Sequence, residues 1–211
     1  MTILRRLCFS LLFVTIAFLA QAYDEEAVAK EVRLARSAAP QAISEKAAVY
    51  VFVHGNYILS DKGSNGFTCL VLRDGDPSSR YPVCLDPEWT RCELPEYLKE
   101  AELRAAGMPD EKIEGELDRM RRNGSFPNPK RSGIAYMASP EMRGMYVVVK
   151  NGKIQPHVMI YAPGVTNSQI GVKDVNQARR EHIPFAANEG KPNAHILCPI
   201  MTYADGTKYE E

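Results

Sequence analysis

The chain lacks several features that assign proteins to well-defined classes. After residue 22 it has no apolar run of the ~20 residues that a membrane helix needs, so no later membrane span is expected. Its 26 basic residues are balanced by 26 acidic ones, and without a basic excess nucleic acid is not expected as a partner. It also has no Cys-x-x-Cys pair and no solenoid repeat, which argues against a zinc site and a repeat fold.

The first feature that the sequence does contain is a leader segment. Arg5 and Arg6 precede an apolar run over residues 7–19, and the small-residue box Ala-Gln-Ala ends at residue 22. This pattern predicts a secretory signal peptide over residues 1–22 and an extracytoplasmic mature protein, periplasmic or secreted, that starts near Tyr23. The remaining sequence has 24 basic and 26 acidic residues. Its slight negative charge disfavours binding to an anionic membrane surface.

Four cysteines follow the leader, and an even number in an exported chain indicates disulfides. Four cysteines allow three full pairings. Cys69 and Cys84 flank residues 74–79, a segment rich in turn-forming residues that can bring the two together, so this pairing is favoured. Cys92 with Cys198 is the weaker prediction, because Cys198 lies in a strand-like run where a buried free thiol is also ordinary.

The residue pattern predicts one α+β domain over residues 23–211, an antiparallel sheet with an N-terminal helix and an inserted helical pair. Turns at 54–56 and 63–66 predict that the first three strands form a meander. A turn at 151–152 pairs Val149 with Ile154 and Tyr146 with His157, although Pro156 favours a separate pairing for 157–161. The expected helices are 24–38, one starting at 87, 95–106, 110–123 and 174–181. The expected strands are 47–53, 57–59, 67–72, 134–137, 145–149, 157–161 and 195–200.

Two histidines are the candidates for chemistry. His157 and His195 each stand at the head of an apolar strand, and neighbouring strands could bring both imidazoles to one end of the sheet. That arrangement would suit a metal-dependent or acid/base hydrolase, whereas the ordinary alternative is a histidine that bonds a backbone carbonyl. The spacing supplies no third metal ligand, so no metal site and no cofactor are predicted. No serine or cysteine has the surroundings of a nucleophile.

Aromatic residues give a second set of candidates. Tyr136, Tyr146 and Tyr161, together with Trp89, could line a ligand pocket, because small-molecule sites combine aromatic walls with a few polar groups. The same residues could equally form the edge of the core. The sequence leaves both interpretations open.

Five segments carry a resemblance: KAAVYVF at 46–52, GSNGFTC at 63–69, PVC at 82–84, GIAYM at 133–137 and PHVM at 156–159. Together they resemble an uncharacterised family of exported bacterial proteins. The resemblance implies a bacterial source, an extracytoplasmic location and a Cys69–Cys84 disulfide. It brings no known activity and does not include the second cysteine pair.

These observations favour a non-catalytic binding or structural module over an enzyme. The expected partner is a small molecule, an envelope component or another protein. The alternative is the hydrolase that uses His157 and His195.

Overall fold

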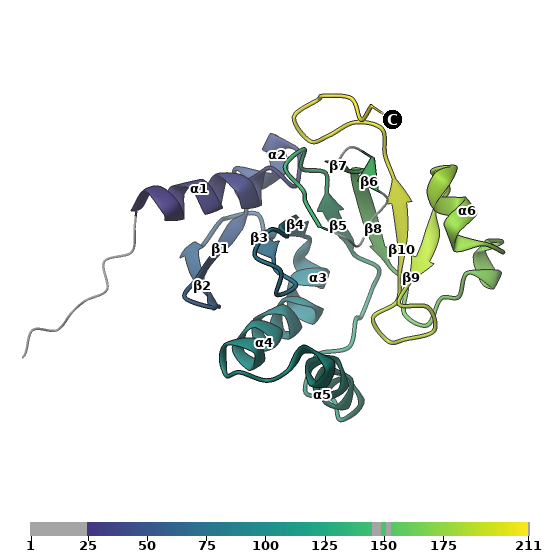
Figure 1. Cartoon of the computed structure of the whole chain (residues 1–211), viewed down its shortest axis with the longest axis horizontal. Helices are drawn as coiled ribbons and strands as arrows, with labels where there is room; N and C mark the ends of the chain where they lie inside the picture. Colours follow the sequence, from purple (N-terminus) through teal and green to yellow (C-terminus); the bar gives the residue numbers. More distant parts are fainter. Residues whose placement is uncertain (1–24, 145–148, 151–152, 211) are drawn as a thin grey trace, which may run out of the picture.

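The computed structural model describes residues 25–144, 149–150 and 153–210. It contains an eight-stranded, mostly antiparallel sheet with helices against it, so the α+β prediction is confirmed (Figure 1). The strand order is β2-β1-β3-β4-β5-β8-β10-β9. The eight strands of this sheet are β1 Ala48–Val53, β2 Asn56–Asp61, β3 Thr68–Leu72, β4 Tyr81–Leu85, β5 Ile134–Met137, β8 His157–Tyr161, β9 Phe185–Ala187 and β10 His195–Pro199.

Five of the helical segments fall where the sequence predicts them. They are α1 Glu25–Arg36, α3 Pro87–Cys92, α4 Leu94–Ala105, α5 Asp110–Arg122 and α6 Val175–Arg180. Two further short segments are α2 Gln41–Ser44 and the 3₁₀ turn η1 Ser168–Ile170. Asp86 begins α3 by accepting a hydrogen bond from the Trp89 backbone N–H, a cap that leaves one fewer helix donor unpaired. Among the described helices, none is long and apolar enough to cross a membrane.

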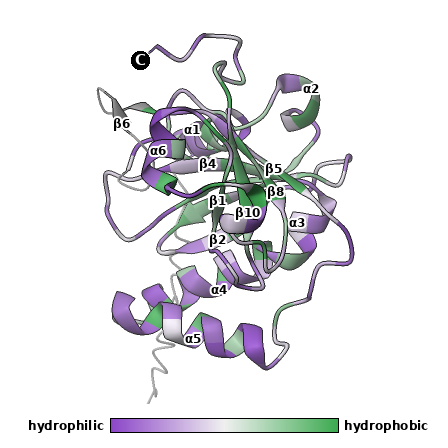
Figure 2. Ribbon diagram, turned by 90° about the vertical axis from the view of Figure 1, so that its right-hand side faces the viewer, coloured by the Kyte–Doolittle hydropathy of each residue, from purple (hydrophilic) through white to green (hydrophobic). Residues whose placement is uncertain are grey.

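The strand pattern explains why helices cover both faces of the sheet. Side chains alternate between faces along a strand. Val49, Val51 and Cys69 pack with α1 in one cluster, whereas Leu70 and Val83 belong to the cluster that includes Trp89 of α3. Every residue of β4 is therefore buried. Figure 2 shows the hydrophobic residues gathered on these central strands and the hydrophilic ones on α5 and α6.

The predicted meander is wrong in one pairing. β1 and β2 form the expected hairpin, with Val53 opposite Asn56, but β3 then pairs with β1 in parallel. The segment after β2 thus returns along the far side of β1 rather than turning back on β2. It is held there by the Asn65 side chain, which donates a hydrogen bond to the Ile43 carbonyl oxygen at 2.7 Å.

The helical pair is confirmed, and its direction follows from its ion pairs. Glu96 at the start of α4 pairs with Arg121 at the end of α5. Arg104 at the end of α4 lies 3.1 Å from Asp110 at the start of α5. The two helices are therefore antiparallel, with α4 against the sheet and α5 beyond it (Figure 1).

The late hairpin also follows the prediction where it is described. In the two-stranded sheet of β6 (Val149–Lys150) and β7 (Lys153–Ile154), Val149 lies opposite Ile154. β8 pairs with β5 and β10 instead, the separate pairing that Pro156 favours. The predicted leader 1–22 and Tyr146 lie outside the described residues.

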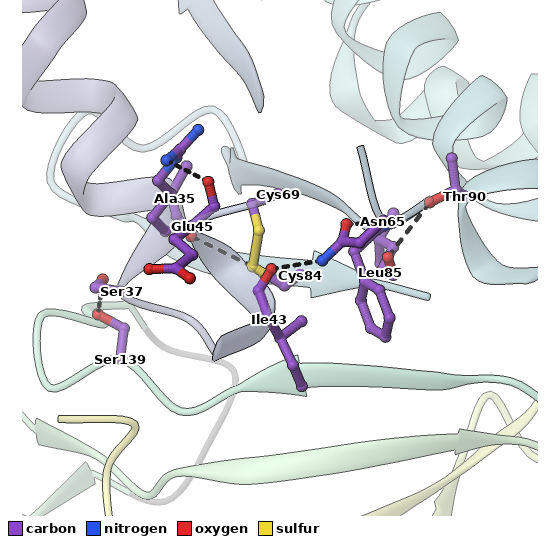
Figure 3. The surroundings of a disulfide bond; sticks show 12 residues. Ala35, Ser37, Ile43, Glu45, Asn65, Cys69, Cys84, Leu85, Thr90 and Ser139 are labelled. Carbon is purple, nitrogen blue, oxygen red and sulfur yellow. Dashed lines mark hydrogen bonds between the residues drawn. A yellow bond between two sulfur atoms is a disulfide. The ribbon is translucent and has the colours of Figure 1, made fainter. Parts of the chain in front are cut away.

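Cys69 and Cys84 form a disulfide, which confirms the favoured pairing (Figure 3). The two residues are directly opposite each other on β3 and β4, and both are fully buried. The Cys84 sulfur lies 3.7 Å from the Ala35 carbonyl oxygen of α1. The cross-link therefore sits in the cluster that joins α1 to the sheet.

Removing this cross-link tests its contribution to stability. The Cys69→Ala/Cys84→Ala variant is expected to lose about 3 kcal/mol of unfolding free energy, because a loop of this length is no longer closed in the unfolded chain. Urea denaturation measures the loss, with Cys198→Ala as the unpaired control. Of the four cysteines that follow the leader, alkylation of the denatured protein should label only Cys92 and Cys198 until a reductant is added. Labelling of all four before reduction would contradict the disulfide.

The weaker pairing of Cys92 with Cys198 is wrong, because both are free thiols. Cys92 is buried on α3, on the side of the sheet where Trp89 meets His195. Cys198 is an odd number of positions from His195 and so points to the opposite face. Burial raises the pKa of Cys92 to about 11, so this thiol stays protonated.

Candidate functional site

A cavity of about 680 Å³ opens on the sheet face that α1 does not cover. Small-molecule pockets in proteins span roughly 300–1,000 Å³, so this volume suits a ligand of ordinary size. Its walls come from α4 on one side and from α6 and β9 on the other. Of its 22 lining residues, 13 are aromatic or aliphatic: Phe52, Tyr57, Leu72, Tyr81, Tyr97, Ala101, Met137, Met159, Val175, Phe185, Ala186, Ala187 and Leu197.

The cross-strand register explains this apolar floor. Residues directly opposite each other in paired strands share a face. Met159 of β8 lies opposite Leu197 of β10, and Leu197 lies opposite Phe185 of β9. Leu72 lies opposite Tyr81 in the same way at the β3–β4 end. Strands far apart in the sequence thus contribute one continuous apolar surface.

Two charged pairs stand at the edge of the cavity. Arg73 donates to the Glu31 carboxylate of α1 at 2.7 Å, and Arg104 donates to Glu100 at 3.0 Å and to Asp110. Each arginine here already has a carboxylate partner. These pairs hold α1, β3 and α4 in place around the opening rather than offering free charge to a ligand.

His157 is part of the cavity floor. It is 2 % exposed, and its Nδ1 lies 2.9 Å from the Gln155 carbonyl oxygen. A carbonyl can only accept, so Nδ1 carries the proton and Nε2 keeps a lone pair. Nε2 has no hydrogen-bond partner among the described residues. Burial lowers the pKa of His157 to about 4, with a smaller contribution from His195, so the ring is neutral at pH 7.

His195 lies in a different environment. Its ring packs edge-on against Trp89 at 5.5 Å between centroids, and its Nδ1 lies 3.1 Å from the Asn193 carbonyl oxygen. Burial lowers its pKa as well. The strands are neighbours, as the hypothesis requires, but antiparallel: His195 pairs with Tyr161, and His157 pairs with Pro199.

The two imidazoles are consequently not brought to one end of the sheet. Four positions along a strand correspond to roughly 13 Å of backbone. Each ring also bonds the carbonyl two residues upstream, just before its own strand begins, and in antiparallel strands these directions are opposite. Across residues 25–144, 149–150 and 153–210, no three His, Cys, Asp or Glu side chains are placed to hold a metal ion. The arrangement does not favour the hydrolase hypothesis.

Two of the tyrosines singled out from the sequence, Tyr136 and Tyr161, do not line this cavity. Tyr136 lies opposite Cys84, on the α1 side of the sheet, and contacts Phe67 at 6.4 Å between ring centroids. Tyr161 is buried and donates a hydrogen bond to Glu93. As ligand-binding residues both stay predictions: neither lines this cavity, although Tyr161 lines a smaller hollow beside Glu93, and Tyr146 lies outside the described residues. Tyr136 is on the opposite face of the sheet, whereas Tyr161 shares the face of Met159 but packs against Trp89 of α3.

The aromatic residues that do line the cavity escaped sequence reasoning. Tyr57 and Tyr97 lie on β2 and α4, and Phe185 lies on the short strand β9, which the sequence did not predict. Leu72 and Tyr81 offered the one usable signal, because they flank the turn-rich segment 74–79 and lie opposite each other where the chain folds back. The others come together only through long-range packing.

A buried acidic cluster lies beside the cavity, where α3 meets α4. The Glu93 side chain accepts a hydrogen bond from the Tyr161 hydroxyl at 2.8 Å. The neighbouring Glu96 is ion-paired with Arg121, whose Nε lies 2.7 Å from a Glu96 carboxylate oxygen. Burial, together with the nearby Glu96, raises the pKa of Glu93 to about 7, against the lowering effects of the Tyr161 hydrogen bond and of Arg121. Glu93 therefore titrates near neutral pH.

Comparison with known proteins assigns no family or function to this chain. No protein-family model, no curated protein and no solved structure matches the chain. The resemblance to exported bacterial proteins stays a prediction from the sequence. Any function must be argued from the cavity itself.

Proposed function

We propose that this protein is a non-catalytic extracytoplasmic binding protein whose cavity holds a small, mainly apolar molecule. The supporting observation is the cavity of about 680 Å³, in which 13 of the 22 lining residues are aromatic or aliphatic. Such a lining stabilises a bound ligand by removing apolar surface from water. The disulfide and the predicted leader support the extracytoplasmic location.

A second hollow, of about 880 Å³, lies between α1 and the edge of β1. It is the weaker candidate because six of its 13 lining residues are charged, against six of 22 in the first cavity; they are Lys30, Glu31, Arg33, Arg73, Arg80 and Glu141. A mainly apolar molecule would leave those groups without water or partners, which is unfavourable. The two hollows therefore call for a variant that blocks only one of them.

Ala187→Trp is that variant. Ala187 lines the proposed site from β9, a strand at the sheet edge, and an indole there occupies space that a ligand needs. We expect it to weaken binding of the neutral fluorescent probe phenylnaphthylamine at least tenfold, roughly the loss of two buried methylene contacts. Fluorescence titration of the purified protein measures the affinity.

Ala106→Trp is the matched control. Ala106 is exposed at the end of α4 and is not among the residues that line the cavity. It is expected to bind the probe as the unmodified protein does, and circular dichroism establishes that both variants fold. Equal binding by all three proteins would place the probe elsewhere and overturn the proposed site, as would the absence of binding to the unmodified protein.

A further inference from the structure

Arg179 is the charged group in the cavity lining whose interactions are least satisfied. It lies on α6, and its guanidinium carbon sits 5.1 Å from the centre of the Phe185 ring, which also lines the cavity. Its Nε is buried and has no hydrogen-bond partner. Within the described part of the chain, no carboxylate lies at ion-pair distance from it. The stacking fixes the cation at the cavity wall without neutralising it.

The other charged lining groups have partners. Arg73 and Arg104 are ion-paired as described above. Asp74 accepts hydrogen bonds from the Tyr81 hydroxyl at 2.9 Å and from the Asp76 backbone. Both carboxylate oxygens of Glu189 accept hydrogen bonds from Asn167, and these bonds lower the pKa of Glu189. The acids are therefore satisfied as acceptors, whereas the Arg179 donors are not.

Tyr97 adds a second free donor from the opposite wall. Its side chain lines the cavity from α4, and its hydroxyl has no hydrogen-bond partner among the described residues. Burial raises the pKa of Tyr97 well above its usual value, so the hydroxyl keeps its proton. Unmet donors are costly when buried, and a ligand that supplies acceptor oxygens removes that cost.

From this arrangement we infer the ligand class: a free carboxylic acid with an apolar body, bound as its anion, with the carboxylate at Arg179 and the body along the Met159–Leu197 floor. The inference rests on the proposed function and adds that the bound ligand carries a negative charge. A planar guanidinium suits a carboxylate because it donates two parallel hydrogen bonds. Tyr97 offers a further donor to the ligand's oxygens or to another polar group of the body.

Two fluorescent probes of the same ring system test this inference. Anilinonaphthalene sulfonate carries an anionic group, and phenylnaphthylamine lacks it. We expect Arg179→Gln to weaken binding of the sulfonate about tenfold, the usual cost of a lost charged hydrogen bond, and to leave the neutral probe within twofold. Arg180→Gln, the exposed neighbour on the same helix, is the matched control and should change neither affinity.

Competition extends the test to the proposed carboxylate. Decanoate should displace phenylnaphthylamine from the unmodified protein at a lower concentration than decanol, and Arg179→Gln should remove the difference. Decanol or decyltrimethylammonium that competes better than decanoate would overturn the inference while leaving the cavity proposal standing. The same holds if Arg179→Gln binds the sulfonate probe unchanged. If neither probe binds the unmodified protein, the proposed function fails, and the ligand class fails with it.

Discussion

Replacing Arg121 by methionine is expected to lower the free energy of unfolding by about 3–5 kcal/mol, the cost of removing one partner from a buried ion pair. The side chains of Arg121 and Glu96 are 9 % and 8 % exposed. Without the guanidinium, the Glu96 carboxylate stays buried with no cation, and it also faces Glu93. Urea denaturation with tryptophan fluorescence gives the change, since Trp89 is the only tryptophan.

Two comparison variants isolate the cause. Arg122 is the exposed neighbour, so Arg122→Met should change the unfolding free energy by no more than about 0.5 kcal/mol. The double variant Glu96→Leu/Arg121→Met removes both charges and should recover most of the lost stability, because no charge is then left buried. A double variant as unstable as Arg121→Met alone would attribute the loss to packing between α4 and α5 instead.

The features predicted correctly from the sequence are those set by short-range signals. The turn-rich segment 74–79 predicted that Cys69 and Cys84 would meet, and they are opposite each other on paired strands. The Asp86-Pro87 dipeptide predicted where α3 begins. In each case the residues that decide the structure are close together in the chain.

The failures concern relations between distant segments. Nothing local distinguishes a meander from the observed parallel pairing of β3 with β1, because the turn at 63–66 suits either connection. His157 and His195 do head neighbouring strands, as predicted, but the direction of pairing depends on how β9 and the loops around it pack. That direction decides whether two strand heads share one end of the sheet.

The residues that line the cavity could not be predicted from the sequence for the same reason. Tyr161 lies in an apolar stretch of the sequence and Tyr97 in a charged one, yet the first is hydrogen-bonded inside the core and the second lines the cavity with a hydroxyl that has no hydrogen-bond partner among the described residues. Which of them reaches a ligand depends on the placement of α4 against the sheet. A motif search cannot find such a site, because its residues come from eight strands, two helices and the loops between them, without fixed spacing.

Glu93 is expected to make stability fall as the pH rises through neutrality. Its pKa is about 7 in the folded protein, whereas an unfolded glutamate titrates near 4.5. Between these values the folded state binds more protons than the unfolded state, so stability declines with rising pH across this window. The shift corresponds to about 3 kcal/mol, present in full below pH 4.5 and lost above pH 7.

The Glu93→Gln variant isolates this contribution from that of His157. The pKa of His157 is lowered to about 4, so burial of its neutral ring makes stability rise between pH 4 and 6.5, opposite to the effect of Glu93. The difference between Glu93→Gln and the unmodified protein cancels the His157 contribution, because both proteins contain it. Glutamine can still accept the Tyr161 hydrogen bond, and Glu96, Arg121 and Cys92 surround the site in both proteins.

That difference should be near zero below pH 4.5 and should reach about 3 kcal/mol in favour of Glu93→Gln above pH 7. Chemical denaturation at a series of pH values measures it. Glu102→Gln, an exposed substitution on the same helix, should give a difference that does not vary with pH. A flat difference for Glu93→Gln as well would mean that Glu93 is ionised throughout this range, and that Tyr161 and Arg121 offset the cost of burying its charge.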